Sequence, residues 1–241
     1  MNIYQNTVNR PISFSGVGLH SGKISNVKLL PASEDSGIIF KRVDLENNNL
    51  ILSNYKNVSS ATLCTTLKND HNVVVSTVEH LLAAFYINRI DNIIVEIDNE
   101  EVPIMDGSSK NFLSILDKAG IKKLNKKKKY INILKKFEFE DNKRKISIEP
   151  NFSFEVDFEL DYKNKIIGKQ KNMINFLKDD LEEIIESRTF CLYEDIEKIK
   201  KIGLAKGGSL DNAVVVNDEK VLNKEGLRNK KEFVNHKILD L

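Results

Sequence analysis

Apolar and polar residues alternate along the first half of the chain in a pattern that predicts strands followed by helices. The predicted strands lie at 27–30, 37–43, 72–75 and 92–97. A helix is predicted to begin at Ser76, because Ser76 and Glu79 have the spacing of a capping box before the apolar run Leu81–Phe85. The turn Asp106-Gly107-Ser108 predicts the start of a second helix, which extends to Leu116.

The second half repeats this order. Antiparallel strands are predicted at 130–139, 145–149 and 152–160, helices at 179–187 and 194–201, and a buried strand at 213–216. A last helix is predicted from Asn229, where Asn229 and Glu232 again have capping-box spacing. Strands first and helices later, twice over, predict an α+β fold of two similar domains, each a β-sheet layered with α-helices.

A block of lysines lies near the middle of the chain, in the sequence KKLNKKKK at 122–129. A run of like charges is typical of a solvated loop. No aromatic side chains are interleaved with it on which bases could stack. We therefore expect a loop rather than a nucleic-acid-binding patch, and we divide the chain there into an N-terminal domain, 1–125, and a C-terminal domain, 126–241.

Composition narrows the class of protein. With 241 residues, 41% of them hydrophobic and 30% charged, the chain can bury a sizeable core. The net charge of +2 is too balanced to indicate a nucleic-acid partner. There is no apolar run of transmembrane length and no signal peptide at the N-terminus, so we expect a cytoplasmic protein. Its two cysteines are then expected to stay reduced.

Candidate chemistry lies in two of the predicted helices. His236 and Asp240 are four residues apart, so their side chains project from one helix face and can bind one metal ion, although a surface pair that supports the helix has the same spacing. His80 follows Glu79 at the start of an apolar helix. If His80 joined the pair, two imidazoles and one carboxylate would form a hydrolytic zinc site, with Glu79 as general base. Spacing alone does not bring the two helices together, and it assigns no role to the loop residue His20.

Six stretches of the sequence match one known family in order along the chain. They are GVGLHSGK at 16–23, STVEHLLAAF at 76–85, VPIMDGSS at 102–109, SRTF at 187–190, GGSLDNAVV at 207–215 and GLRNKKEFVNHKILD at 226–240. In these stretches the chain resembles the UDP-3-O-acyl-N-acetylglucosamine deacetylases, zinc amidases of lipid A biosynthesis in Gram-negative bacteria. The resemblance implies an active site between two domains and a UDP-sugar acyl substrate. We expect a monomer.

The resemblance also assigns roles to individual residues. It implies one Zn²⁺ per chain, bound by the metal ligands His80, His236 and Asp240. Glu79 matches the general base and Thr189 a residue that helps to hold the oxyanion. The substrate contacts that it implies are Phe190 at the sugar, Lys237 at the polar head, Tyr162 against uracil, Arg144 near the diphosphate, and Leu63, Leu192, Ile196 and Leu204 along a passage for the acyl chain. Core packing would give the apolar spacing of the last three residues equally well.

The sequence departs from the family pattern in two places. The family's leaving-group histidine, and the aspartate that orients it, would follow the last helix, whereas the sequence stops at Leu241. We therefore expect an incomplete chain, which deacetylates more slowly than a C-terminally extended one. The alternative is a truncated, catalytically impaired or substrate- or metal-binding form of the same fold. The second departure is Lys163-Asn164-Lys165, which replaces the family's His-Pro turn near the uridine site.

Overall fold

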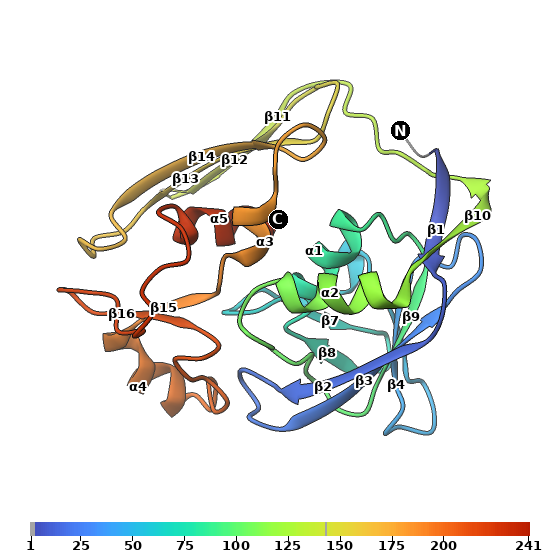
Figure 1. The fold of residues 1–241 in the computed structure, drawn as a ribbon, viewed down its shortest axis with the longest axis horizontal. Helices are drawn as coiled ribbons and strands as arrows, with labels where there is room; N and C mark the ends of the chain where they lie inside the picture. Colours follow the sequence, from blue (N-terminus) through green and yellow to red (C-terminus); the bar gives the residue numbers. More distant parts are fainter. Residues whose placement is uncertain (1–2, 143) are drawn as a thin grey trace.

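The computed structural model describes residues 3–142 and 144–241, which form a mixed α+β fold with several sheets (Figure 1). The largest sheet has five strands in the order β2-β3-β9-β4-β5, and only its β4–β9 pair is parallel. These strands are β2 Ile12–Val17, β3 Ile24–Pro31, β9 Ile93–Ile97, β4 Ile38–Arg42 and β5 Leu50–Leu52.

Two helices pack on one face of this sheet, α1 Glu79–Ile87 and α2 Lys110–Ala119. Alternate residues of β3 and β9 are buried, as the period of two in a strand requires. The buried residues form one core with the helices, and its members include Val27, Leu29, Ile93, Val95, Ile97, Leu81, Phe85, Phe112 and Leu116. This core fixes α1, which carries Glu79 and His80.

A small three-stranded sheet leads into α1. It consists of β6 Val58–Ser60, β7 Thr66–Lys68 and β8 Val74–Ser76, with the short 3₁₀ helix η1 Tyr55–Asn57 before it. The predicted capping box at Ser76 is wrong. Ser76 ends β8, and its hydroxyl donates to the Glu100 carbonyl, so α1 begins only at Glu79.

Residues 122–127 of the lysine-rich segment lie in a strand, so the loop predicted at 122–129 is wrong over those residues. β10 Ile121–Lys127 pairs antiparallel with β1 Tyr4–Val8. The backbone ladder needs no apolar side chains, and the lysines of β10 point to solvent or pair with acids, as Lys126 does with Asp35. The predicted boundary between residues 125 and 126 lies inside this strand. The division into two domains stays a prediction.

The rest of the chain forms two hairpins, a short parallel pair and three helices. The hairpins are β11 Phe137–Asp141 with β12 Arg144–Ile148, and β13 Glu155–Asp161 with β14 Lys169–Asn175. The parallel pair is β15 Phe190–Leu192 with β16 Val214–Val216, and the helices are α3 Glu182–Glu186, α4 Tyr193–Lys201 and α5 Glu232–Leu239. α3 and α5 cover the inner face of β13–β14, where Val156 and Leu160 are buried (Figure 1).

Most other predicted elements are present with shifted ends. Of the strand predicted at 130–139, only the last three residues lie in a strand, β11. The second predicted capping box is also wrong, because Glu232 turns its carboxylate to Arg188 and to the Arg228 amide. No helix within the described residues has the length and apolar character needed to cross a membrane.

Candidate metal centre

Helices α1 and α5 bring His80, His236 and Asp240 together. One ligand atom from each lies within 4.8 Å of the other two. Asp240 Oδ1 is 3.5 Å from His80 Nε2, and Asp240 Oδ2 is 3.3 Å from His236 Nε2. The two imidazole rings are 5.2 Å apart and nearly perpendicular. Side chains predicted separately from two distant segments thus form one cluster.

Local sequence explains how each helix presents its ligands. His80 is the second residue of α1, before the helix-forming run Leu81–Phe85 that is buried against the sheet. His236 lies in α5, and Asp240 caps its C-terminal end with helical backbone angles, so the spacing of four keeps both side chains on one face. Phe233 and Val234 are fully buried and anchor α5 in the core.

The two histidines of the cluster are buried and Asp240 is half-buried, and three polar atoms of the cluster are not satisfied. Nδ1 of His80, Nδ1 of His236 and Oδ1 of Asp240 have no hydrogen-bond partner among the described residues. Burial lowers the pKa of His236 to about 3, so its imidazole is neutral and able to ligate a metal. Burial raises the pKa of Asp240, but the neighbouring His236, His80 and Lys237 outweigh burial and the net pKa is lowered. Two imidazoles beside an ionised carboxylate are a donor set that fits zinc.

Glu79 lies beside the cluster, in the first turn of α1. Its Oε2 accepts a hydrogen bond of 3.1 Å from the Thr65 amide. Burial raises the pKa of Glu79, and the adjacent His80 offsets part of that effect. Glu79 therefore presents a carboxylate to the same space as the three candidate ligands without belonging to their set.

A cavity of about 160 Å³ opens over the cluster. Five of the residues that the sequence assigned to substrate or oxyanion contacts line it together with the cluster and Glu79, namely Leu63, Tyr162, Thr189, Phe190 and Lys237. Lys237 Nζ lies 3.0 Å from Asp240 Oδ2 and 5.5 Å from the centre of the Phe190 ring. The Tyr162 ring packs edge-on against Phe190.

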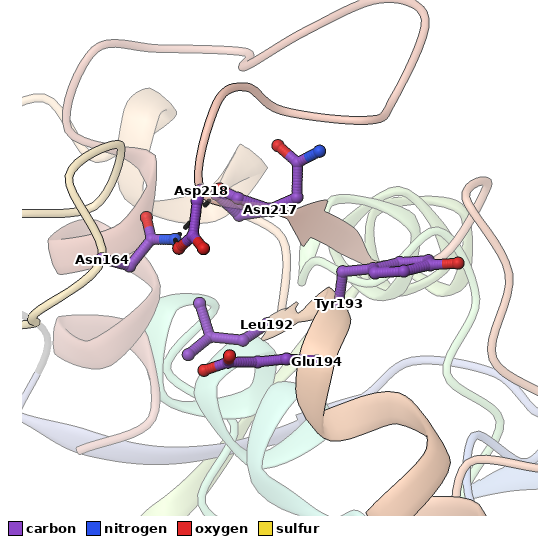
Figure 2. Close-up of a pocket in the computed structure, with 7 residues that line it drawn as sticks. Asn164, Leu192, Tyr193, Glu194, Asn217 and Asp218 are labelled. Carbon is purple, nitrogen blue, oxygen red and sulfur yellow. Dashed lines mark hydrogen bonds between the residues drawn. The ribbon is translucent and has the colours of Figure 1, made fainter.

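Four predicted contacts lie elsewhere and stay predictions. Arg144 begins the exposed strand β12, and Ile196 and Leu204 lie in and after α4, outside the residues that line this cavity. Leu192 lines a second, smaller cavity of about 100 Å³ with Tyr193, Glu194, Asn217 and Asp218, drawn in Figure 2. That cavity shares no lining residue with the metal centre among the described residues.

His20 also lines the metal-centre cavity, although the sequence assigned it no role. Its amide donates to the buried carboxylate of Glu101 at 2.8 Å, which fixes the loop after β2. Nδ1 of His20 accepts from the Ala205 amide at 3.4 Å, and burial lowers the pKa of the ring. Only the position of His20 inside a glycine-rich turn could have indicated a fixed loop, and that signal does not specify a cavity.

Comparison with known proteins identifies the family. The sequence model of one family, described as LpxC, UDP-3-O-acyl N-acetylglycosamine deacetylase, matches residues 5–241. The chain belongs to this family. It is similar to the UDP-3-O-acyl-N-acetylglucosamine deacetylase of Nautilia profundicola, with 43% identity over 237 residues that make up 98% of this chain and 80% of the relative.

Two further relatives carry the same description. The protein of Sodalis glossinidius is 43% identical over 241 residues, which cover 99% of this chain and 79% of the relative. The protein of Helicobacter pylori is 41% identical over 237 residues, which cover 98% of this chain and 79% of the relative. The family is zinc-dependent, which agrees with the donor set formed by α1 and α5.

Proposed function

We propose that the chain is a zinc-dependent amidase that removes the acetyl group from UDP-3-O-acyl-N-acetylglucosamine in lipid A biosynthesis. His80, His236 and Asp240 are the proposed ligands of one zinc ion. The assignment is supported above all by the convergence of these three side chains, with buried nitrogen and oxygen atoms that have no hydrogen-bond partner among the described residues. Membership of the deacetylase family supplies the reaction.

Zinc in such a site supplies the chemistry of hydrolysis, because it lowers the pKa of water and polarises a carbonyl. Glu79 is the proposed general base. It borders the cavity beside the proposed ligands, and the hydrogen bond from the Thr65 amide to Oε2 fixes the position of the carboxylate that would take the proton. Protonated Glu79 is then placed to return that proton to the leaving amine.

Thr189 is the proposed oxyanion contact. Its backbone is fixed on both sides, because its amide donates to the Gly107 carbonyl at 2.8 Å and its carbonyl accepts from the Val214 amide at 2.8 Å. A rigid backbone keeps the hydroxyl where negative charge develops on the substrate, and such preorganised donors lower the barrier.

The remaining substrate contacts are proposed in two groups. Lys237, Phe190, Tyr162 and Leu63 are proposed to hold the sugar, its polar head and the start of the acyl chain, since all four line the cavity. The contacts of Arg144 with the diphosphate, and of Leu192, Ile196 and Leu204 with the acyl chain, rest on the family resemblance. We also propose a two-domain arrangement with boundary 125/126, a monomeric state and a cytoplasmic location.

Release of acetate tests the function. The purified chain is incubated with UDP-3-O-acyl-N-acetylglucosamine as prepared, after removal of metal by a chelator, and after zinc is restored. We expect acetate release that the chelator abolishes and zinc restores. A chain that binds zinc but releases no acetate would contradict the proposal and favour a metal-binding form of the fold.

A further inference from the structure

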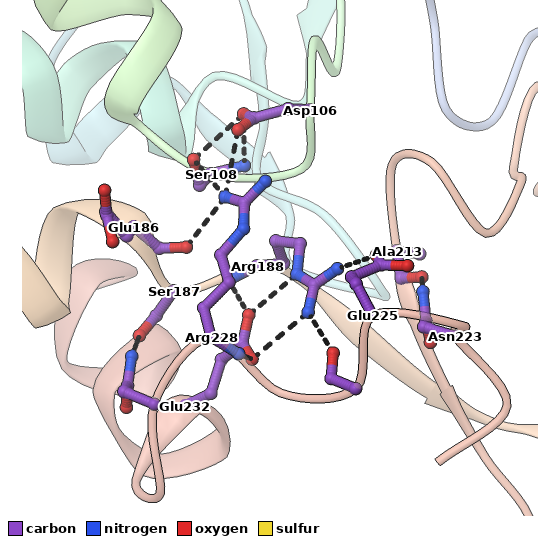
Figure 3. A network of polar contacts seen from close by, with 12 residues as sticks. Asp106, Ser108, Glu186, Ser187, Arg188, Ala213, Asn223, Glu225, Arg228 and Glu232 are labelled. Atoms are coloured by element: carbon purple, nitrogen blue, oxygen red, sulfur yellow. Dashed lines mark hydrogen bonds and ion pairs between the residues drawn. The ribbon is translucent and has the colours of Figure 1, made fainter.

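A buried ion pair holds the first residue of α5. The side chain of Arg188 is 1% exposed and that of Glu232 is fully buried. Glu232 Oε1 accepts from the Arg188 amide at 3.1 Å and from Arg188 Nε at 2.8 Å, and Oε2 accepts from Arg188 Nη2 at 3.3 Å and from the Arg228 amide at 2.7 Å (Figure 3). Both carboxylate oxygens are thus satisfied. Thr189, which follows Arg188, lines the cavity, and Phe233, which follows Glu232, continues α5.

Arg228 extends this network to the N-terminal half of the chain. Its Nη1 donates to Asp106 Oδ2 at 2.9 Å, to Ser108 Oγ at 3.3 Å and to the Glu186 carbonyl at 2.9 Å (Figure 3). These acceptors belong to two segments far apart in sequence, the turn before α2 and the end of α3. A planar guanidinium can hold several acceptors in a fixed arrangement, which an ammonium group does less well.

The turn at 106–109 also contacts the backbone of His80, the proposed ligand that lies in α1. Ser109 Oγ donates to the His80 carbonyl at 2.9 Å, and the Ser109 amide donates to the Ile185 carbonyl at 3.1 Å. Hydrogen bonds therefore run from His80 in α1, through the turn at 106–109, to Arg228 and Glu232 at the start of α5. Apart from His80, none of these network residues lines the cavity, so they act on the site only through the placement of the two helices.

We propose that Arg188, Glu232, Arg228 and Asp106 form a positioning clamp that sets the approach of α5 to α1. The clamp keeps His236 and Asp240 at the distance from His80 that one zinc ion requires. This inference rests on the proposed zinc site. Because ligands that are held in place lose little freedom on binding, the clamp raises zinc affinity without contacting the metal.

Zinc affinity of Arg228 and Asp106 variants tests the clamp. The zinc dissociation constant is measured by competition with a chelator for the unmodified chain, Arg228→Met, Asp106→Asn and the double variant. Thermal unfolding of each metal-free chain is recorded alongside. The side chains of Arg228 and Asp106 are partly exposed and pair with each other. Arg228 contacts Glu232 through its backbone amide, so these changes leave the buried Arg188–Glu232 pair in place. Arg42→Met is the matched control. It removes a guanidinium that pairs with Asp44 and donates to the Val74 carbonyl, and these contacts belong to neither the network nor the cavity.

We expect Arg228→Met and Asp106→Asn each to weaken zinc binding about tenfold, the lower end of the range for residues that support metal ligands. The double variant should lose little more than Arg228→Met alone, because Arg228→Met already removes the contact that Asp106→Asn removes. Arg42→Met should bind zinc within about twofold of the unmodified chain. If Arg228→Met does not fold, Asp106→Asn alone decides.

Unchanged zinc affinity in a folded Arg228 or Asp106 variant would overturn the clamp and leave the zinc site standing. Equal weakening in Arg42→Met would also overturn it, since general destabilisation would then explain the effect. If the unmodified chain bound no zinc, or bound it equally after His236→Ala, the proposed function itself would fail and the clamp with it.

Discussion

Replacing Glu79 by Gln separates proton transfer from zinc binding. The two side chains have nearly the same shape, and an amide oxygen can still accept the 3.1 Å hydrogen bond from the Thr65 amide. We therefore expect the free energy of unfolding to change by less than about 1 kcal/mol. Because Glu79 is outside the proposed ligand set, the variant should still bind zinc. What it loses is the ability to take up a proton.

Loss of a general base costs about 10²–10⁴ in rate. That range corresponds to about 2.7–5.4 kcal/mol of transition-state free energy. The assay is the initial rate of acetate release from UDP-3-O-acyl-N-acetylglucosamine with zinc in excess, compared between the unmodified chain and Glu79→Gln. Glu100→Gln is the control, since Glu100 is an exposed carboxylate paired with Lys23 at 3.5 Å. A Glu79→Gln variant that bound zinc and kept its rate within about threefold would refute the assignment of Glu79 as base.

Three further predictions concern stability. Phe233→Ala in α5 should lower the free energy of unfolding by about 3–5 kcal/mol in denaturant, because the ring is fully buried, whereas the exposed Ile24→Ala should change it little. Gly107→Ala and Gly226→Ala both place a side chain at positive φ, +85° and +72°, but only at Gly107 would the new Cβ overlap a backbone carbonyl oxygen of the loop before β16. Gly107→Ala should therefore lose clearly more than the roughly 1–2 kcal/mol of left-handed backbone strain expected for Gly226→Ala, and equal losses would contradict this. Hydrogen bonds from two lysines and a glutamine hold the pKa of Asp35 below its ordinary 3.8. The ionised Asp35 carboxylate therefore stabilises the folded state fully above about pH 4, and this contribution is lost as pH falls further. Asp35→Asn should accordingly be less stable than the unmodified chain at pH 7, by an amount that shrinks towards pH 2 in denaturant titrations.

The sequence predicted the strands whose side chains alternate between the core and solvent. β3 and β9 alternate between buried and exposed residues, and this period of two is readable in the sequence. β10 was missed because its lysines carry no apolar period, and its pairing with β1 depends on backbone hydrogen bonds across more than a hundred residues. The capping boxes failed for a similar reason. Ser76 and Glu232 form hydrogen bonds with distant partners, Glu100 and Arg188, in place of the local caps that their spacing predicted.

The site was predicted in pieces. The spacing of four between His236 and Asp240 is a local property, and it holds in the structure. The meeting of this pair with His80 is a tertiary property, which spacing could not supply and only the family resemblance anticipated. Ala83 and Ile87 of α1 pack on Ile238 and Leu239 of α5, and the polar contacts between the two helices run through Arg228, Asp106 and Ser109. The sequence indicated a turn at Asp106 but none of these long-range contacts. His20 was missed likewise, because its burial depends on Glu101, which lies far along the chain.

The zinc content of the unmodified chain and of His236→Ala tests the central claim most directly. Both proteins are stripped with a chelator, incubated with excess zinc, freed of unbound metal and analysed for zinc per chain by elemental analysis. The account predicts one zinc ion per unmodified chain and almost none in His236→Ala, since the variant keeps only two of the three ligating side chains. Full zinc occupancy in His236→Ala, or none in the unmodified chain, would contradict it.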